Sequence, residues 1–340
     1  MDSLTHIILG AALGEALLGK KIGRKAALVG ALAKTIPDFD LLYTGLKDPR
    51  LYMCYHRGHT HSLLWEGLYA LPLALLFYWL FRRKVEYKQW LVLFLVCLWG
   101  HSLLDTCTNY GTRLFLPLTQ QAYSWNNLAI VDLFFTLPML LLLIIALLCR
   151  NGSLGRTIFN STLLVYCFGY LGMTVLHKQT AEARTLASLE SQHIPYKKFF
   201  TNPTILNNIL WYGMAVNDTA VYVGEFTLLK PAAPIRWHQY PRHREWLMAH
   251  ADTADMKLLT WFSGDYDITE KKGDTLQVYC VKFGRTNMKE EACEKTFVMY
   301  YKLYENDGQW HMGMQEPNQK NANIKEGFFD LMDRIHGYKN

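Results

Sequence analysis

The sequence predicts a membrane α-helical bundle followed by a water-soluble α+β domain with antiparallel strands. Apolar residues make up 51% of the 340, but they are spread unevenly along the chain. Leu, Ala, Phe and Gly dominate residues 1–178, whereas most Asp, Glu, Lys and Asn residues follow. The second part also contains runs in which apolar and polar residues alternate. We therefore expect two domains, a membrane domain over 1–178 and a soluble domain over 179–340.

Four apolar runs in the first part have close to the roughly 20 residues that a membrane-spanning helix needs. These runs cover residues 63–81, 90–106, 128–149 and 158–176. Two earlier apolar segments, 4–18 and 26–36, are shorter and rich in Gly and Ala. Gly10 and Gly14 have the spacing that lets two helices pack closely. We expect these segments to form a short N-terminal helical hairpin against about four spanning helices.

Basic residues predict the orientation of the membrane domain. They gather in "GKKIGRK", "RRKVEYK" and "CRNGSLGR", which lie between the first and second, third and fourth, and fifth and sixth helices. The positive-inside rule assigns these connections to the cytoplasm. The opposite helix ends and everything after residue 178 should then be extracytoplasmic. Asp2 stands where a signal peptide would be basic, so we expect no cleaved signal peptide.

The soluble domain should begin with a helix at "QTAEARTLASLES" and end with one at "IKEGFFDLMDRIHG". Between them, alternation with β-branched and aromatic residues predicts antiparallel strands. These strand-like stretches are "TAVYVGEFTLL", "LLTWFSGDYDITE", "DTLQVYCVKFG" and "TFVMYYKLYENDGQW". Cys280 and Cys293 can form a disulfide if the domain lies outside the cytoplasm.

Two short motifs of the membrane domain carry candidate metal ligands. "HSLLDT" separates His101 from Asp105 by four positions, which puts them on the same face of a helix. The alternative is a buried His–Asp pair that only holds helices together. "TIPDFDLL" places Asp38 and Asp40 directly after Pro37, and here the alternative is an ordinary polar helix break.

A third motif, "YHRGHTHSLLW", precedes a spanning run and holds His56, His59 and His61 within six positions. A lone histidine there would be read as structural, but three so close together favour a metal site. Two single residues are weaker candidates. His6 begins the first helix and Asp132 lies near the outer end of the fifth.

The predicted topology brings nearly all of these side chains to the outer face. Polar groups at membrane depth are costly unless they are paired or bind a metal. Imidazole and carboxylate ligands suit Zn²⁺, with Mn²⁺ or Fe²⁺ as alternatives, and the set leaves room for two ions. The predicted metal ligands are His6, Asp38, Asp40, His56, His61, His101, Asp105 and Asp132.

Such a site predicts hydrolysis of an ester or phosphoester by a metal-activated water. We expect Arg57 and Asp105 to act in catalysis, with Arg57 holding an anionic group of the substrate. The alternative role of Arg57 is contact with a lipid head group. Membrane lipids or a lipid-like substrate are the expected partners. Nucleic acid is not expected, because no basic stripe with interleaved aromatic residues occurs.

The motifs "MDSLTH", "PDFD", "HRGHTHSLL", "GHSLLDTCTNYG" and "VDLFFTLP" resemble those of the bacterial YdjM-type membrane-bound metal-dependent hydrolases. The resemblance covers the membrane domain. In its His-Arg-Gly-x-Thr-His-Ser pattern, His59 falls on the variable position, which implies that His56 and His61 are the ligands. Leu133 departs from the pattern, where a proline is expected after Asp132.

The same resemblance implies a location in the bacterial cytoplasmic (inner) membrane. It also implies a distant similarity to zinc-dependent phospholipase C and P1-type nucleases, and hence phosphoester chemistry on a lipid.

Two other functions are compatible with the same residues. A metal or proton transporter would also use intramembrane His, Asp and Glu residues, although Glu15 is nearly alone near the inner side. A non-catalytic receptor would use the soluble domain to bind a ligand and keep the metal as a structural element.

Overall fold

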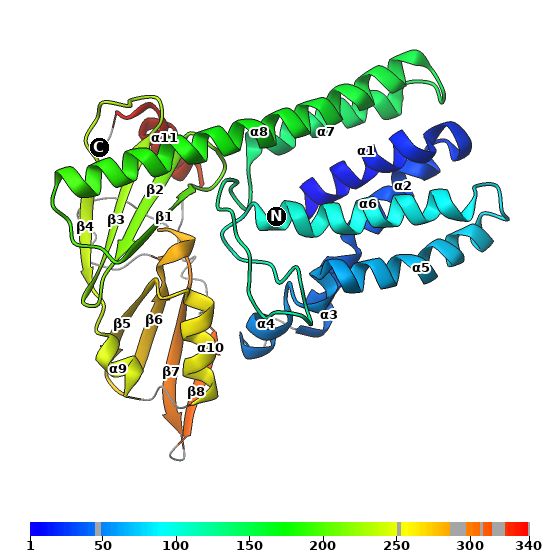
Figure 1. Cartoon of the computed structure of the whole chain (residues 1–340). Coiled ribbons are helices and arrows are strands. Elements are labelled where there is room, and N and C mark those ends of the chain that lie inside the picture. The colour runs from blue at the N-terminus through cyan, green and yellow to red at the C-terminus, as the bar shows by residue number, and fades with distance from the viewer. Residues whose placement is uncertain (45–48, 250–252, 286–296, 307–308, 315–323, 339–340) are drawn as a thin grey trace. The chain divides into compact units, whose positions relative to one another are not determined.

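The computed structural model describes the whole chain except residues 45–48, 250–252, 286–296, 307–308, 315–323 and 339–340 (Figure 1). The described chain divides into two compact units. The first contains Met1–Thr44, Tyr55–Leu176 and Ile205–Asn208. The second contains Gly45–Cys54, His177–Thr204 and Ile209–Asn340.

The first unit is helical, as the sequence predicts. Its elements are α1 (Ser3–Ile22), α2 (Lys25–Thr35), η1 (Ile36–Asp40), α3 (Leu41–Thr44), η2 (His59–His61), α5 (Leu63–Leu80), α6 (Tyr87–Thr106), α7 (Leu133–Leu148) and the first part of α8 (Leu154–Ser191). The short α4 (Pro49–Tyr55) precedes η2. Among the described helices, α5, α6 and α8 are long and apolar enough to cross a membrane.

The third predicted span, 128–149, is shorter in the structure. Asp132 caps α7 by accepting a hydrogen bond from the Phe135 amide, so the helix begins only at Leu133. The 16 residues of α7 are fewer than the roughly 20 that span a bilayer without help from neighbours.

Helices α1 and α2 lie side by side and form the N-terminal hairpin that the sequence predicts (Figure 1). Gly10 and Gly14 of α1 contact the backbone of α2 directly. A Cβ atom at Gly14 would overlap the carbonyl oxygen of Ala26, and one at Gly30 would overlap that of Gly10. Only residues without a side chain allow this close approach.

Helix α8 joins two segments that the sequence analysis treats separately. The predicted span 158–176 and the following polar helix 179–191 form one continuous helix of 38 residues. No Gly or Pro interrupts the chain between Leu176 and Ser191, so nothing in the sequence ends the helix there.

The second unit contains two antiparallel four-stranded sheets, which confirms the predicted strand arrangement. One has the order β1 (Lys198–Pro203), β2 (Leu210–Val216), β3 (Ala220–Thr227) and β4 (Arg236–Pro241). The other has the order β5 (Asp267–Lys272), β6 (Thr275–Cys280), β7 (Tyr300–Asn306) and β8 (Gln309–Met314). The remaining helices are α9 (Arg244–Met248), α10 (Ala254–Ser263) and α11 (Ile324–His336).

Strand β2 is buried on both faces, which hides the alternation that identifies strands in a sequence. Trp211 packs with Ala181 of α8 on one face, whereas Met214 packs with Ile268 of the second sheet on the other. This is why β2 was not predicted. Strands β1 and β4 were missed as well.

One predicted strand is wrong over half its length. The stretch 258–270 begins inside α10 and only its end forms β5. The Thr253 side chain caps α10, and Gly264, with φ +62°, ends it in a left-handed conformation. The terminal helix α11 is confirmed. Cys293 lies outside the described residues, so its pairing with Cys280 stays a prediction.

Candidate metal centre

The candidate ligands lie at one end of the helical unit, because helix ends and turns of several elements meet there. Pro37 lies in the first turn of η1, which directly follows α2 and carries Asp38 and Asp40. η2 carries His61 after Gly58, where a Cβ atom would come within 2.8 Å of the Tyr55 carbonyl oxygen. The last turns of α6 supply His101 and Asp105.

Four of the predicted ligands converge: Asp38, His61, His101 and Asp105, each with one ligand atom within 4.8 Å of the other three. The Nε2 atoms of His61 and His101 are 3.1 Å apart. Asp38 Oδ1 lies 3.6 Å from Nε2 of His61 and 3.4 Å from that of His101. Asp105 Oδ2 lies 3.4 Å and 3.7 Å from the same two atoms.

The other ring nitrogen of each histidine is held by a hydrogen bond. His101 Nδ1 donates to the Lys34 carbonyl oxygen at 2.6 Å. Thr60 Oγ1 donates to Asp40, so it accepts from His61 Nδ1 at 2.9 Å. In their neutral forms, both rings therefore direct an Nε2 lone pair into the cluster. Two lone pairs 3.1 Å apart repel unless a cation, either a proton or a metal ion, lies between them.

Without a metal, a proton supplies that charge. Burial alone would lower the pKa of His61, but the neighbouring carboxylates of Asp105 and Asp38 raise it to about 9. Burial would raise the pKa of Asp38, yet hydrogen bonds from His101 and His61 hold it well below its usual range. The two carboxylates therefore stabilise a positive charge between the histidines.

Asp40 and His56 form a layer behind His61. His56 Nδ1 is 3.0 Å from Asp40 Oδ1, and the Arg57 amide donates to Asp40 Oδ2. Burial lowers the pKa of His56 despite the nearby Asp40 carboxylate. Both residues were predicted from the sequence to be ligands. The structure instead places Asp40 where it fixes the Thr60 hydroxyl that orients His61.

Asp105 has further partners. His6 Nε2 lies 3.2 Å from Asp105 Oδ1, and the amino group of Met1 contacts the same oxygen. The His6 ring stacks on that of His101, with centroids 3.7 Å apart. His6 is therefore adjacent to the four-residue group, although it is not a member of it.

Arg57 was expected to hold an anionic substrate group. The residue is only 5% exposed, and Nε lies 2.9 Å from Asp105 Oδ2 while Nη1 donates to Thr108. The guanidinium also lies over the Tyr110 ring, with Cζ 4.8 Å from its centroid. Its charge is thus directed at Asp105.

Two other candidates lie apart from the group. Asp132 accepts a hydrogen bond from the Tyr170 hydroxyl in addition to capping α7, so its carboxylate is already used. His59 is exposed, and its ring lies near Trp65. Neither belongs to a group of convergent ligands in the described part of the chain.

Sequence reasoning missed Lys34, Glu66 and Ser102, which lie around the centre. The Lys34 carbonyl oxygen orients His101, and its Nζ is buried with no hydrogen-bond partner among the described residues. Glu66 is fully buried in α5 and accepts a hydrogen bond from Ser102 at 2.6 Å. Lys34 and Glu66 could have been found from the sequence, because each is a charged residue inside an apolar helix.

The ligand set fits a transition-metal ion. Zn²⁺ with ligands at 2.0–2.1 Å in a tetrahedron requires about 3.3 Å between neighbouring ligand atoms. The five separations described above lie between 3.1 and 3.7 Å. Arg57 Nε lies 2.9 Å from the buried Asp105 Oδ2 but outside hydrogen-bond geometry, so lone pairs of this oxygen remain for such an ion.

Comparison with known proteins points to one family. A family profile described as YdjM inner membrane protein matches residues 1–181. YfhP of Bacillus subtilis (strain 168), described as uncharacterized, is 27% identical over 178 residues. That alignment covers 50% of this chain and 52% of YfhP, so the chain spans about half the length of this curated relative. No solved structure matches the chain.

Proposed function

Because this chain belongs to the YdjM inner membrane protein family and directs two histidines and two aspartates at one point, we propose that it is a metal-dependent membrane hydrolase. The proposed substrate is an ester or phosphoester, with a lipid as the natural candidate at a membrane site. Zn²⁺ is the proposed ion, with Mn²⁺ or Fe²⁺ as alternatives. The observation that carries the proposal is the pair of Nε2 atoms 3.1 Å apart.

When bound, such an ion would polarise a substrate oxygen and activate a water. Asp38, His61, His101 and Asp105 would hold it. Four protein ligands close a tetrahedral zinc site, so catalysis requires a higher coordination number or the release of one ligand. Asp38 is the candidate for release, because its side chain is 12% exposed while the other three are at most 1% exposed.

Arg57 would support this site indirectly. Its guanidinium lies 2.9 Å from Asp105 Oδ2, which fixes the carboxylate beside the histidines. Direct contact between Arg57 and a substrate phosphate would require this ion pair to open. We further propose that the metal end of the helices faces the outside of the cytoplasmic membrane, following the positive-inside assignment.

Turnover by the purified full chain tests the proposal. The metal is removed with a chelator and restored as Zn²⁺ or Mn²⁺. Hydrolysis by the protein is then measured with bis(p-nitrophenyl) phosphate and with short-chain phosphatidylglycerol. We expect metal-dependent hydrolysis, reduced at least about 100-fold in His61→Ala because the pair of Nε2 ligands is broken. His59→Ala, which changes an exposed histidine in the same loop, is the control. Absence of metal-dependent turnover on both ester classes contradicts the proposal.

A metal or proton transporter is the alternative. The buried Lys34 and Glu66 favour transport, because they add charged side chains to the interior of the helical unit beside the ligands. Glu15 argues against it, since its carboxylate forms a two-point salt bridge with Arg156 and is not free to carry an ion. Metal uptake into proteoliposomes that is lost in Glu66→Gln, without any ester hydrolysis, would favour transport.

A further inference from the structure

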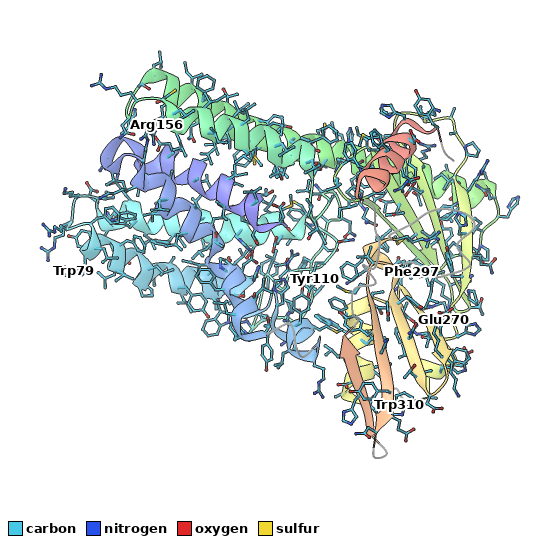
Figure 2. The ribbon with its side chains drawn as sticks, turned by 180° about the vertical axis from the view of Figure 1, so that it is seen from behind. Trp79, Tyr110, Arg156, Glu270, Phe297 and Trp310 are labelled. Atoms are coloured by element: carbon cyan, nitrogen blue, oxygen red, sulfur yellow. The ribbon has the colours of Figure 1, made fainter. Side chains whose placement is uncertain are left out.

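A second feature lies at the opposite end of the helical unit from the metal centre. Figure 2 shows Tyr110 at one end of these helices and Arg156 at the other. At the Arg156 end, the turns α1–α2, α5–α6 and α7–α8 surround a pocket of about 440 Å³. Three segments far apart in the sequence therefore contribute to one concavity.

The pocket is strongly basic. Lys20, Lys21, Lys25 and Lys84 line it, and no carboxylate does. Lys21 donates a hydrogen bond to Gln89. The other three ammonium groups have no hydrogen bond or ion pair within the described residues. Four like charges around one hollow repel each other, which an anion in the pocket would relieve.

Nearby carboxylates are already used. Glu15 accepts hydrogen bonds from Nε and Nη2 of Arg156, both at 2.6 Å, within the protein. The side chain of Glu86 caps the first turn of α6 together with Gln89. Neither carboxylate is therefore available to neutralise the lysines.

The turns around the pocket are fixed by the same contacts. Arg156 of α8 joins Glu15 of α1 and also donates to Asn151, which lines the pocket. Arg24 donates to the Leu147 carbonyl oxygen and so connects the α1–α2 turn to α7. A pocket held this way exists before a ligand arrives, which reduces the entropic cost of binding.

The composition of the lining indicates the ligand. Ammonium groups bind phosphate as point charges, and Ile22 and Phe81 add apolar surface beside them. This end also carries the basic turns that the positive-inside rule assigns to the cytoplasm, where the leaflet is anionic. We propose that this pocket binds the phosphate group of an anionic phospholipid head group. The proposal is independent of the proposed hydrolase activity.

Native mass spectrometry of the delipidated full chain tests this. The chain is titrated with phosphatidylglycerol or, separately, zwitterionic phosphatidylcholine. The pocket variant is Lys20→Gln, Lys25→Gln and Lys84→Gln. The control variant, Arg82→Gln, Lys88→Gln and Arg150→Gln, removes the same charge from residues outside the pocket lining. We expect phosphatidylglycerol binding to weaken about tenfold in the pocket variant and less than about twofold in the control.

Inorganic phosphate added as a competitor separates two sources of the same chemistry. Displacement of phosphatidylglycerol by millimolar phosphate supports a site for the phosphate alone, whereas resistance supports recognition of the whole head group. Equal binding by both variants, or no preference over phosphatidylcholine, overturns the proposal. A melting temperature equal to that of the wild type confirms that the pocket variant is folded, and Lys84→Gln alone, with a smaller loss expected, replaces it if it is not.

Discussion

At the scale of single residues, the centre depends on which nitrogen of each ring faces inward. Hydrogen bonds to Lys34 and Thr60 occupy the Nδ1 atoms of His101 and His61, so both Nε2 atoms face the same point. The motif "HTHS" indicated the histidines, but no sequence pattern specifies these partners. The spacing of His101 and Asp105 on α6 was enough to predict a shared face.

Proton release on metal binding follows from the pKa of His61, which nearby carboxylates raise to about 9 against the effect of burial. Below that pH the metal-free ring holds a proton that a metal must displace, so affinity should fall about tenfold per pH unit below 9. Calorimetry at pH 7.5 in buffers of different ionisation enthalpy should detect about one proton released. His59→Ala should release the same number, and no release in the wild type would refute this assignment.

Thr60 should control metal affinity without binding the metal. Its hydroxyl connects Asp40 to His61 Nδ1, at 2.9 Å from each. Thr60→Val removes this connection and should weaken metal binding about 10–100-fold, the range typical of partners that orient a ligand. Chelator competition measures the change. Thr60→Ser retains the hydroxyl and should bind nearly as well as the wild type, so an equal loss in both variants would argue against this role.

At the scale of elements, the close packing of α1 on α2 places His6 and η1 at the same end. Gly30→Ala should destabilise this hairpin, because the new methyl group would overlap the Gly10 carbonyl oxygen. Overpacking of this kind costs about 1–3 kcal/mol. A lower melting temperature in detergent would verify the effect.

Gly169→Ala is the matched control for Gly30→Ala, since apart from the nearby backbone of α8 itself no described atom lies within 4 Å of the added Cβ. This variant should keep or slightly raise the melting temperature, because Ala favours a helix more than Gly does. Similar losses in the two variants would show that helix packing at Gly30 is not the cause.

Helix type and apolar pattern were predictable for the elements whose pattern is strong, namely α5, α6 and α11. Elements decided by tertiary packing were not. Strand β2 is buried on both faces, and the β-prone residues Thr260 and Trp261 lie in α10. Asp132 likewise became a helix cap, a role that its position before an apolar run equally allows.

At the scale of the whole molecule, the predicted topology indicated which residues share one end of the helical unit, which no single motif could indicate. The three basic turns do lie at one end of the helical unit, where residues from each of them line one pocket. The ligands gather at the other end, although they come from positions between 38 and 105. The sequence could predict this shared end. It could not predict that four of the residues converge while Asp40 and His56 form a layer behind His61.

Orientation in the membrane is the prediction that belongs to this scale. With the basic turns in the cytoplasm, the second unit is extracytoplasmic. Proteinase K should therefore degrade this unit in intact spheroplasts and leave it protected in inverted vesicles, as followed with a C-terminal epitope. The opposite pattern would reverse the assignment and place the metal centre at the cytoplasmic face.

Metal content per chain tests the central claim most directly. Purified wild type, His61→Ala and His59→Ala are compared by elemental mass spectrometry after exposure to equal metal. The account predicts about one bound transition-metal ion per chain in the wild type and in His59→Ala, and background in His61→Ala, because the Nε2 pair is broken. Background metal in the wild type, or equal metal in all three proteins, would contradict it.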